Sequence, residues 1–365
     1  MSEQPSIRSL SLSGALKFIF TFRPGTSRKY AWVDYAKGIA IIFVTYRHVI
    51  YGLLYNGIPI TSTLMNANEM LYGFRMPMFF FLSGLFFASS LHRRGGKNFM
   101  ISKINTLLYP YLLWCFIQLT LQILFSDYTN SKKGVENYLD ILIHPRSMLQ
   151  LWYLFALFNV TALYLMVDRW LKFGPWMQLL LGFALLPLKG LAGDISTLSD
   201  IAVYYVYFAL GHLATPYFFK ESVQEELASP VKVLLLIPVF LLVQYYCMKN
   251  VDMSIYLFST FALLGGLLVI MISFVLAKYR KLEFLQVIGH YSLYIYLIHV
   301  GVVFLLRNII LSTGIQIRTS VFTFILIAAG IFFSIIIYRV CLLLKLNFIF
   351  QGPIKDIPRR QVSAS

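Results

Sequence analysis

The sequence predicts an all-α polytopic membrane protein with about ten transmembrane helices. Of its 365 residues, 59% are hydrophobic and only 13% are charged, and the mean hydropathy is +0.73. A soluble domain carries about 25% charged residues. The apolar residues form runs long enough to cross a bilayer. The net charge of +16 comes from residues that lie between these runs, and this distribution argues against a nucleic-acid partner.

Ten spans follow from the apolar runs, with both termini in the cytoplasm. The expected spans are 33–54, 74–91, 104–125, 149–167, 175–188, 199–219, 233–248, 254–276, 284–306 and 319–338. In this orientation the inner segments hold about three times as many Lys and Arg residues as the outer ones, in agreement with the positive-inside rule. We expect a basic leader over 1–30, a transmembrane domain over 31–345 and a polar, disordered cytoplasmic tail over 346–365.

The leader has two interpretations. Apolar residues recur at helical spacing from Leu12 to Phe20, opposite Lys17. This pattern is typical of an amphipathic helix on the membrane surface. A disordered basic leader fits equally well.

The first span carries ionisable residues, which are costly inside a membrane helix and usually mark a function. Asp34, Lys37, Arg47 and His48 all lie within it. At about 100° per residue, Lys37 and His48 differ by only about 20° around the helix, and Asp34 is within about 40° of the same line. Lys37 and His48 are about 16 Å apart along the axis. We expect Asp34 to pair with Lys37, near the cytoplasm, and His48 to lie nearer the outside.

The second span begins with the run GFRMPMFFFLSGLFF over 73–87. The pair Ser83-Gly84 predicts close helix packing. Arg75 needs a partner at this depth, and Glu69 or a bound anionic group are the candidates.

A basic loop over 91–103 follows, with Arg93, Arg94 and Lys103 beside two glycines. These cations are either a positive-inside signal alone or an anion site for phosphates. Charge does not distinguish the two interpretations.

Polar and aromatic residues gather before the fourth span, where Arg146 and Gln150 precede Trp152 and Tyr153. An interfacial aromatic belt explains the two rings, and a carbohydrate platform is the alternative. Asp200, beyond the fifth span, is expected to be solvated.

His299 lies in the outer half of the ninth expected span. A single buried histidine is more often structural than functional. Because His48 is expected at a similar depth, the two together suggest a site lined by imidazoles.

Four motifs, spread over 34–299, together resemble the acyltransferase-3 family of integral-membrane acyltransferases, near its fucose 4-O-acetylase-like members and in the stand-alone form. They are Asp34-x-x-Lys37 followed by His48, the run from Met76 to Gly84, the run from Leu151 to Leu154, and the run from Ser292 to His299. The family often has Arg where Lys37 stands, and Lys lacks the bidentate fork of Arg. An Arg-x-x-Arg pair of the family is also missing, with Lys103 in one of the two places.

The resemblance implies an O-acetyltransferase that uses acetyl-CoA from the cytoplasm and a hydroxyl acceptor on the other side. The acceptor would be a carbohydrate, either a polysaccharide or a lipid-linked glycan, and the protein would be embedded in the lipid bilayer of a bacterial inner membrane. No metal is expected, and a homodimer is one option for the oligomeric state. The competing function is a membrane transporter or flippase, because intramembrane charges also line transport paths.

Within this hypothesis the candidate residues divide into three sets. His48 and Asp34 are catalytic, with His48 acting as a general base or through a covalent acyl-histidine. The donor-binding candidates are cations near the cytoplasm: Lys37, Arg93, Arg94 and Lys103. The acceptor-binding candidates are Arg75, Ser83, Trp152, Tyr153 and His299.

Overall fold

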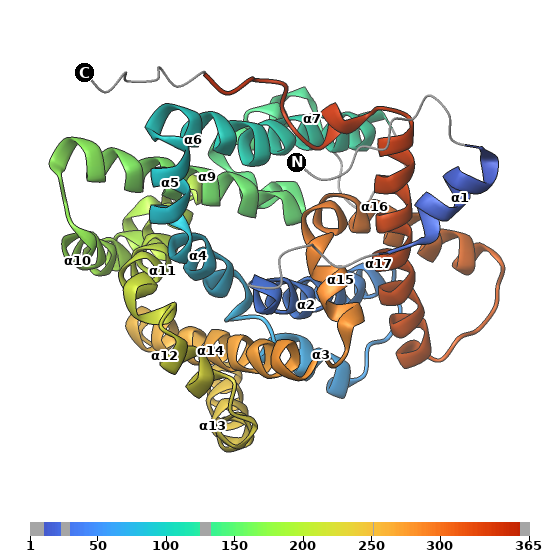
Figure 1. The fold of residues 1–365 in the computed structure, drawn as a ribbon. Helices are drawn as coiled ribbons and strands as arrows, with labels where there is room; N and C mark the ends of the chain where they lie inside the picture. Colours follow the sequence, from blue (N-terminus) through green and yellow to red (C-terminus); the bar gives the residue numbers. More distant parts are fainter. Residues whose placement is uncertain (1–10, 23–29, 125–132, 251, 358–365) are drawn as a thin grey trace. The chain divides into compact units, whose positions relative to one another are not determined.

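The computed structural model describes residues 11–22, 30–124, 133–250 and 252–357, and these residues form helices and no strand (Figure 1). The chain forms two compact units. Unit 1 comprises Met1–Phe79 and Pro216–Leu346, and unit 2 comprises Phe80–Thr215 and Asn347–Ser365.

Unit 1 holds the first span and the C-terminal helices. Its helices are α1 (Leu12–Phe20), α2 (Ala31–Tyr55), α3 (Ser62–Met70), α12 (Glu221–Leu227), α13 (Pro230–Lys249), α14 (Ile255–Tyr279), α15 (Glu283–His290), α16 (Ser292–Ser312) and α17 (Thr319–Leu343).

Unit 2 is built from the middle of the chain. Its helices are α5 (Phe87–Arg94), α6 (Gly96–Lys103), α7 (Tyr109–Leu124), α8 (Asp140–Ile143), α9 (Trp152–Met166) and α10 (Pro175–Leu185). Short π and 3-10 segments adjoin them: Ile104–Leu108, Val135–Tyr138, Pro145–Leu151, Val167–Leu171, Leu186–Ala192 and Asn347–Ile349. Two helices, α4 (Arg75–Leu85) and α11 (Ser196–Phe218), have residues in both units.

Among the described residues, eight helical segments are long and apolar enough to cross a membrane. They are Ala31–Tyr55, Gly96–Leu124, Pro145–Leu171, Pro175–Ala192, Pro230–Lys249, Ile255–Tyr279, Ser292–Ser312 and Thr319–Leu343. A bent pair, Ser62–Leu85 with Phe87–Arg94, raises the number to nine if it forms one span. The chain is therefore a multi-pass helical membrane protein, while the count of ten and the orientation stay predictions.

The structure divides several of the expected segments, among them the second expected span, 74–91, which breaks at Phe86 between α4 and α5. The ninth expected span breaks at Tyr291 into α15 and α16. The basic loop expected over 91–103 consists of two helices, α5 and α6, that meet at Gly95. Gly95 has φ of +74°, a left-handed value that glycine adopts without steric cost, so it can turn the chain sharply between them.

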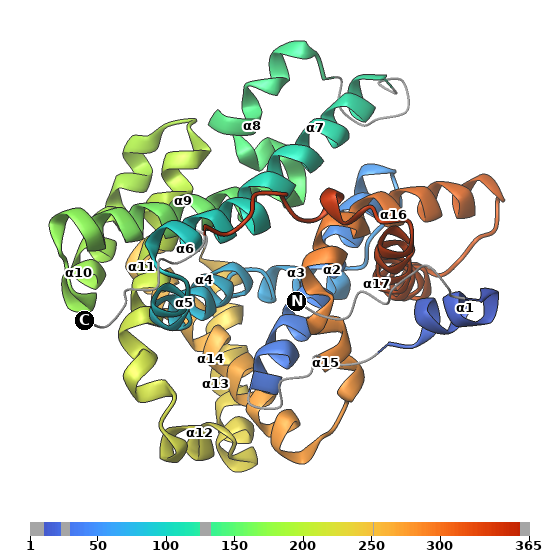
Figure 2. The same cartoon turned by 45° about the horizontal axis from the view of Figure 1, so that its top comes forward.

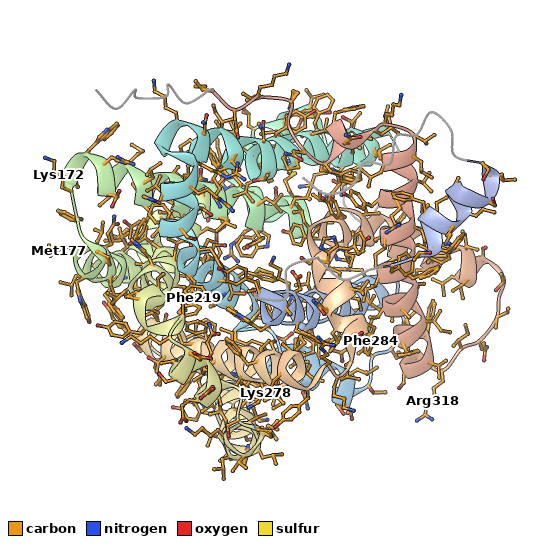
Figure 3. All side chains as sticks on the ribbon, viewed as in Figure 1. Lys172, Met177, Phe219, Lys278, Phe284 and Arg318 are labelled. Atoms are coloured by element: carbon orange, nitrogen blue, oxygen red, sulfur yellow. The ribbon has the colours of Figure 1, made fainter. Side chains whose placement is uncertain are left out.

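Helix α2 packs against α14, α15, α16 and α17 within unit 1. A buried cluster from α2, α16 and α17 fills the space beyond His48: Val49, Leu53, Val303, Phe322 and Leu326. Figure 3 labels Lys278 and Phe284, which flank the turn between α14 and α15, and Arg318, the residue before α17. Van der Waals packing of this kind holds membrane helices together and fixes where α2 presents its polar side chains.

The leader forms a helix where the amphipathic pattern predicted one. Helix α1 lies beside α17 (Figure 2), and Phe22 meets Phe332 edge-to-face at 5.9 Å. None of the α1 residues is buried. Residues 1–10 and 23–29 of the leader lie outside the described residues.

The close helix packing predicted from Ser83-Gly84 is confirmed within unit 2. A Cβ atom on Gly84 would lie 1.9 Å from the carbonyl oxygen of Phe208 on α11. Conversely, a Cβ atom on Gly211 of α11 would lie 2.1 Å from the carbonyl oxygen of Phe81 on α4. Only glycines allow the two backbones to approach this closely.

Candidate functional site

The expected pair of Asp34 and Lys37 is present at the start of α2. The Lys37 Nζ lies 3.8 Å from Asp34 Oδ1, and the two side chains are 38% and 20% exposed. Their partial exposure leaves both charges accessible to a ligand.

Helix α15 brings His290 to this pair. A Cβ atom on Gly289 would lie 1.6 Å from the Asp34 carbonyl oxygen, and one on Gly38 would lie 2.0 Å from the Leu285 carbonyl oxygen. The two helices therefore touch backbone to backbone. Burial lowers the pKa of His290, and the neighbouring Asp34 charge partly offsets this effect.

Arg339, near the end of α17, is a cation that sequence reasoning missed. Its Nη1 donates to the Tyr291 hydroxyl at 2.5 Å, and its Nη2 donates to the carbonyl oxygen of Phe18 on α1. The guanidinium lies 4.3 Å from the centre of the Phe18 ring. Its charge acts on His290 together with that of Lys37. An Arg directly after an apolar span was the available signal, and it was attributed to the positive-inside pattern alone.

His48 and His299 face each other across α2 and α16. Their ring centroids are 5.3 Å apart with a 60° tilt. His48 is partly accessible, and among the described residues no hydrogen bond involves its ring nitrogens. His299 is fully buried. The expected similar depth of the two histidines agrees with this geometry.

Two arginines lie close enough to His48 for their charges to act on it, Arg75 and Arg47. Arg75 is 3% exposed and donates to the carbonyl oxygens of Phe43 and Tyr72. Three donors converge instead on the carboxylate of Glu69: Arg47 Nη1 at 3.3 Å, the Tyr51 hydroxyl at 3.0 Å and Asn68 Nδ2 at 2.8 Å. Glu69 thus forms an ion pair with Arg47, which sequence reasoning left without a role.

Unit 2 brings together several of the other predicted residues. The Tyr153 hydroxyl hydrogen-bonds with the Ser83 side chain. The Arg146 guanidinium lies 4.4 Å from the centre of the Trp152 ring and donates to Asp200 through Nη2 at 2.5 Å and Nε at 2.8 Å. The expectation that Asp200 is solvated is wrong, because its side chain is 1% exposed and needs this ion pair inside the protein.

The basic residues of α5 and α6 also belong to unit 2. Arg94 Nη1 lies 3.6 Å from Asp356, and Lys103 Nζ lies 5.3 Å from the centre of the Phe99 ring. Asp356 belongs to the tail that was expected to be disordered. Up to residue 357 this expectation is wrong. The side chain of Asn98 hydrogen-bonds to the backbone of Ile357, and that of Asn105 to the backbone of Ile354. Residues 358–365 lie outside the described residues.

A family model described as an acyltransferase domain matches residues 30–339, most of the chain. The chain belongs to the acyltransferase-3 family. This match confirms the family that the four sequence motifs indicated. One relative, the nodulation protein NolL of Mesorhizobium japonicum, is 31% identical over 98 residues, which are 27% of this chain and 26% of that relative. No solved structure matches the chain.

The described residues contain no group of three or more His, Cys, Asp or Glu side chains arranged to hold a metal ion. The functional groups that unit 1 does assemble are two imidazoles with two arginines, and a separate cluster of Lys37, His290 and Arg339. These groups are suited to proton transfer and to binding anionic groups.

Proposed function

We propose that this acyltransferase transfers the acetyl group of acetyl-CoA to a hydroxyl of a cell-envelope carbohydrate, such as a polysaccharide or a lipid-linked glycan. The observation that carries the proposal is the accessible ring of His48, which lies beside a second imidazole and within the field of Arg75 and Arg47. An imidazole in a position to exchange a proton with a bound hydroxyl is the usual general base in group transfer.

Acetyl-CoA supplies the acetyl group as a thioester. His48 takes the proton of the acceptor hydroxyl while the hydroxyl oxygen bonds to the carbonyl carbon. Arg75 stabilises the negative charge that develops on the carbonyl oxygen. His48 then returns its proton to the sulfur as the C–S bond breaks, so that an O-acetyl ester and a free thiol result. Asp34 holds Lys37 charged in this scheme and transfers no proton.

The cations at the other end of α2 suit the anionic part of the donor. Lys37 and Arg339 concentrate positive charge in one part of unit 1, beside His290. Phosphate groups bind such clusters through charge-assisted hydrogen bonds. In unit 2, Arg93, Arg94 and Lys103 are further candidates for the donor.

For the acceptor, the candidates are Ser83, Trp152 and Tyr153 in unit 2, while in unit 1 Arg75 and His299 lie beside His48, where the acceptor hydroxyl would react. Carbohydrate binds to aromatic faces flanked by hydrogen-bonding groups, and the contacts of Trp152 with Arg146 and of Tyr153 with Ser83 provide both. We propose that the enzyme is a multi-pass protein of a bacterial inner membrane. A homodimer is one option for its oligomeric state.

The test uses membranes that contain the protein and acetyl-CoA labelled in the acetyl group. We expect label in glycan or glycolipid. Hydroxylamine or mild alkali should release this label, because both reagents cleave O-acetyl esters. Membranes without the protein are the control. Movement of glycan or of a small anionic solute across the membrane with no labelled ester would contradict the proposal and favour a transporter or flippase.

A further inference from the structure

The hydrogen bonds of His299 determine which of its ring nitrogens carries the proton. Its Nδ1 lies 2.8 Å from the carbonyl oxygen of Ile295 and 3.1 Å from that of Tyr296. A carbonyl oxygen only accepts, so Nδ1 must be the donor. The Nε2 of the neutral ring is therefore a hydrogen-bond acceptor.

This acceptor has no donor in the structure. His299 Nε2 is buried and has no hydrogen-bond partner among the described residues. Buried polar atoms without a partner are rare and call for an explanation. A second proton on Nε2 would not supply one, because it would create a buried donor that also lacks a partner.

The ring of His48 is a neighbouring group that can donate. Two imidazole rings joined by an N–H···N hydrogen bond have centroids about 5 Å apart when donor and acceptor are about 3 Å apart. The observed separation of His48 and His299 is 5.3 Å. The χ2 torsion of His48 has broad energy wells, so its ring can reorient toward His299 at little cost.

Packing keeps the two rings at this distance. A Cβ atom on Gly330 of α17 would lie 2.9 Å from the Val303 side chain and 3.6 Å from the Thr45 side chain. Val303 lies one helical turn after His299, and Thr45 lies three residues before His48. The missing side chain at position 330 lets α17 pack onto both helices beside the imidazole pair.

We propose that His299 is a positioning residue for His48, in an inference that rests on the proposed function. Its Nε2 accepts a hydrogen bond from one ring nitrogen of His48, so that the other nitrogen of His48 presents its lone pair to the acceptor hydroxyl. When His48 takes the hydroxyl proton, it carries one proton on each nitrogen, and the bond to His299 stabilises the resulting charge. The proton on His299 Nδ1 stays in place throughout.

Nitrogen NMR tests the tautomers without any substrate. The chain has six histidines, so spectra of 15N-histidine-labelled protein in lipid bilayers are assignable with single variants. We expect His299 to carry its proton on Nδ1 and the resonances of His48 to shift in His299→Gln. A proton on Nε2 of His299, or His48 resonances unchanged in the variant, would overturn the proposal. Because no catalysis is needed, this result is independent of whether the proposed function holds.

Two variants separate positioning from substrate binding. Gln at 299 can donate to the Ile295 carbonyl and still offer an acceptor, whereas Leu can do neither. For His299→Leu we expect kcat to fall by about a hundredfold or more, as for loss of a general-base function, with an unchanged acceptor KM. His299→Gln should recover part of kcat. A raised KM with normal kcat would overturn the proposal in favour of direct acceptor binding.

Equal losses in His299→Leu and His299→Gln, at equal amounts of folded protein, would likewise contradict the positioning role. If His299→Leu does not fold, His299→Gln and the wild-type NMR tautomer still decide the matter. Gly301→Ala is the matched control on the same helix, because a Cβ atom there would meet nothing within 4 Å.

Discussion

The contact between α2 and α15 gives the sharpest structural prediction. In Gly289→Ala, the new Cβ atom would lie 1.6 Å from the carbonyl oxygen of Asp34, whereas ordinary contacts begin at 3.4 Å. The difference between these two distances requires the backbones to separate by about 1.8 Å. Because the neighbouring atom is backbone, no side-chain rotation relieves the clash. Overpacking of this kind costs about 1–3 kcal/mol.

The separation would move His290 away from Asp34 and Lys37. We expect a midpoint of thermal unfolding about 5 °C lower, measured by loss of the monodisperse peak in detergent. We also expect a raised apparent KM for acetyl-CoA. Gly301→Ala adds the same methyl group to a helix where nothing lies within 4 Å, and should leave both quantities unchanged. Wild-type stability and donor KM in Gly289→Ala would refute the backbone contact.

The other predictions concern charges. Lys37→Ala should raise the apparent KM for acetyl-CoA by about tenfold, through loss of a charge-assisted contact. Lys281→Ala, which removes an exposed lysine outside the proposed donor site, is the control and should leave this KM unchanged. An unchanged KM in Lys37→Ala would remove Lys37 from the donor site. Arg146→Ala should lower the free energy of unfolding by about 3 kcal/mol, because it leaves the buried Asp200 carboxylate without its partner. Asp200→Asn should cost less, since the remaining guanidinium is 41% exposed; equal or reversed costs in thermal unfolding would contradict this asymmetry.

The sequence was most informative where the helix period and the cost of membrane burial act together. The span expected over 33–54 is α2, Ala31–Tyr55. The ion pair of Asp34 and Lys37 was predictable because residues three positions apart on a helix are neighbours. The similar depth expected for His48 and His299 was also readable, whereas the contact between their rings depends on how α2 and α16 pack. Depth is readable from one sequence because each span has a fixed rise per residue.

Contacts between distant segments were not readable in the same way. Hydropathy treats Asp200 as a polar residue near an outer loop, although Arg146, 54 positions earlier, pairs with it inside the protein. Gly289, near the end of α15, packs against the Asp34 backbone, a relation between α15 and α2 that no local pattern encodes. The contacts of Arg339 with Tyr291 and with Phe18 on α1 also join segments far apart in the sequence, so the sequence alone did not predict them.

The role of His48 is tested by the initial rate of labelled-acetyl transfer by His48→Ala, in proteoliposomes with equal amounts of folded protein. His144→Ala is the control, because this partly exposed histidine hydrogen-bonds with the Asp194 carbonyl oxygen in unit 2, whereas His48 belongs to unit 1. We predict a rate at least about a hundredfold below wild type for His48→Ala, as expected for loss of a general base, and a normal rate for His144→Ala. A near-normal rate in His48→Ala would contradict the assignment of His48 as the group that accepts the proton.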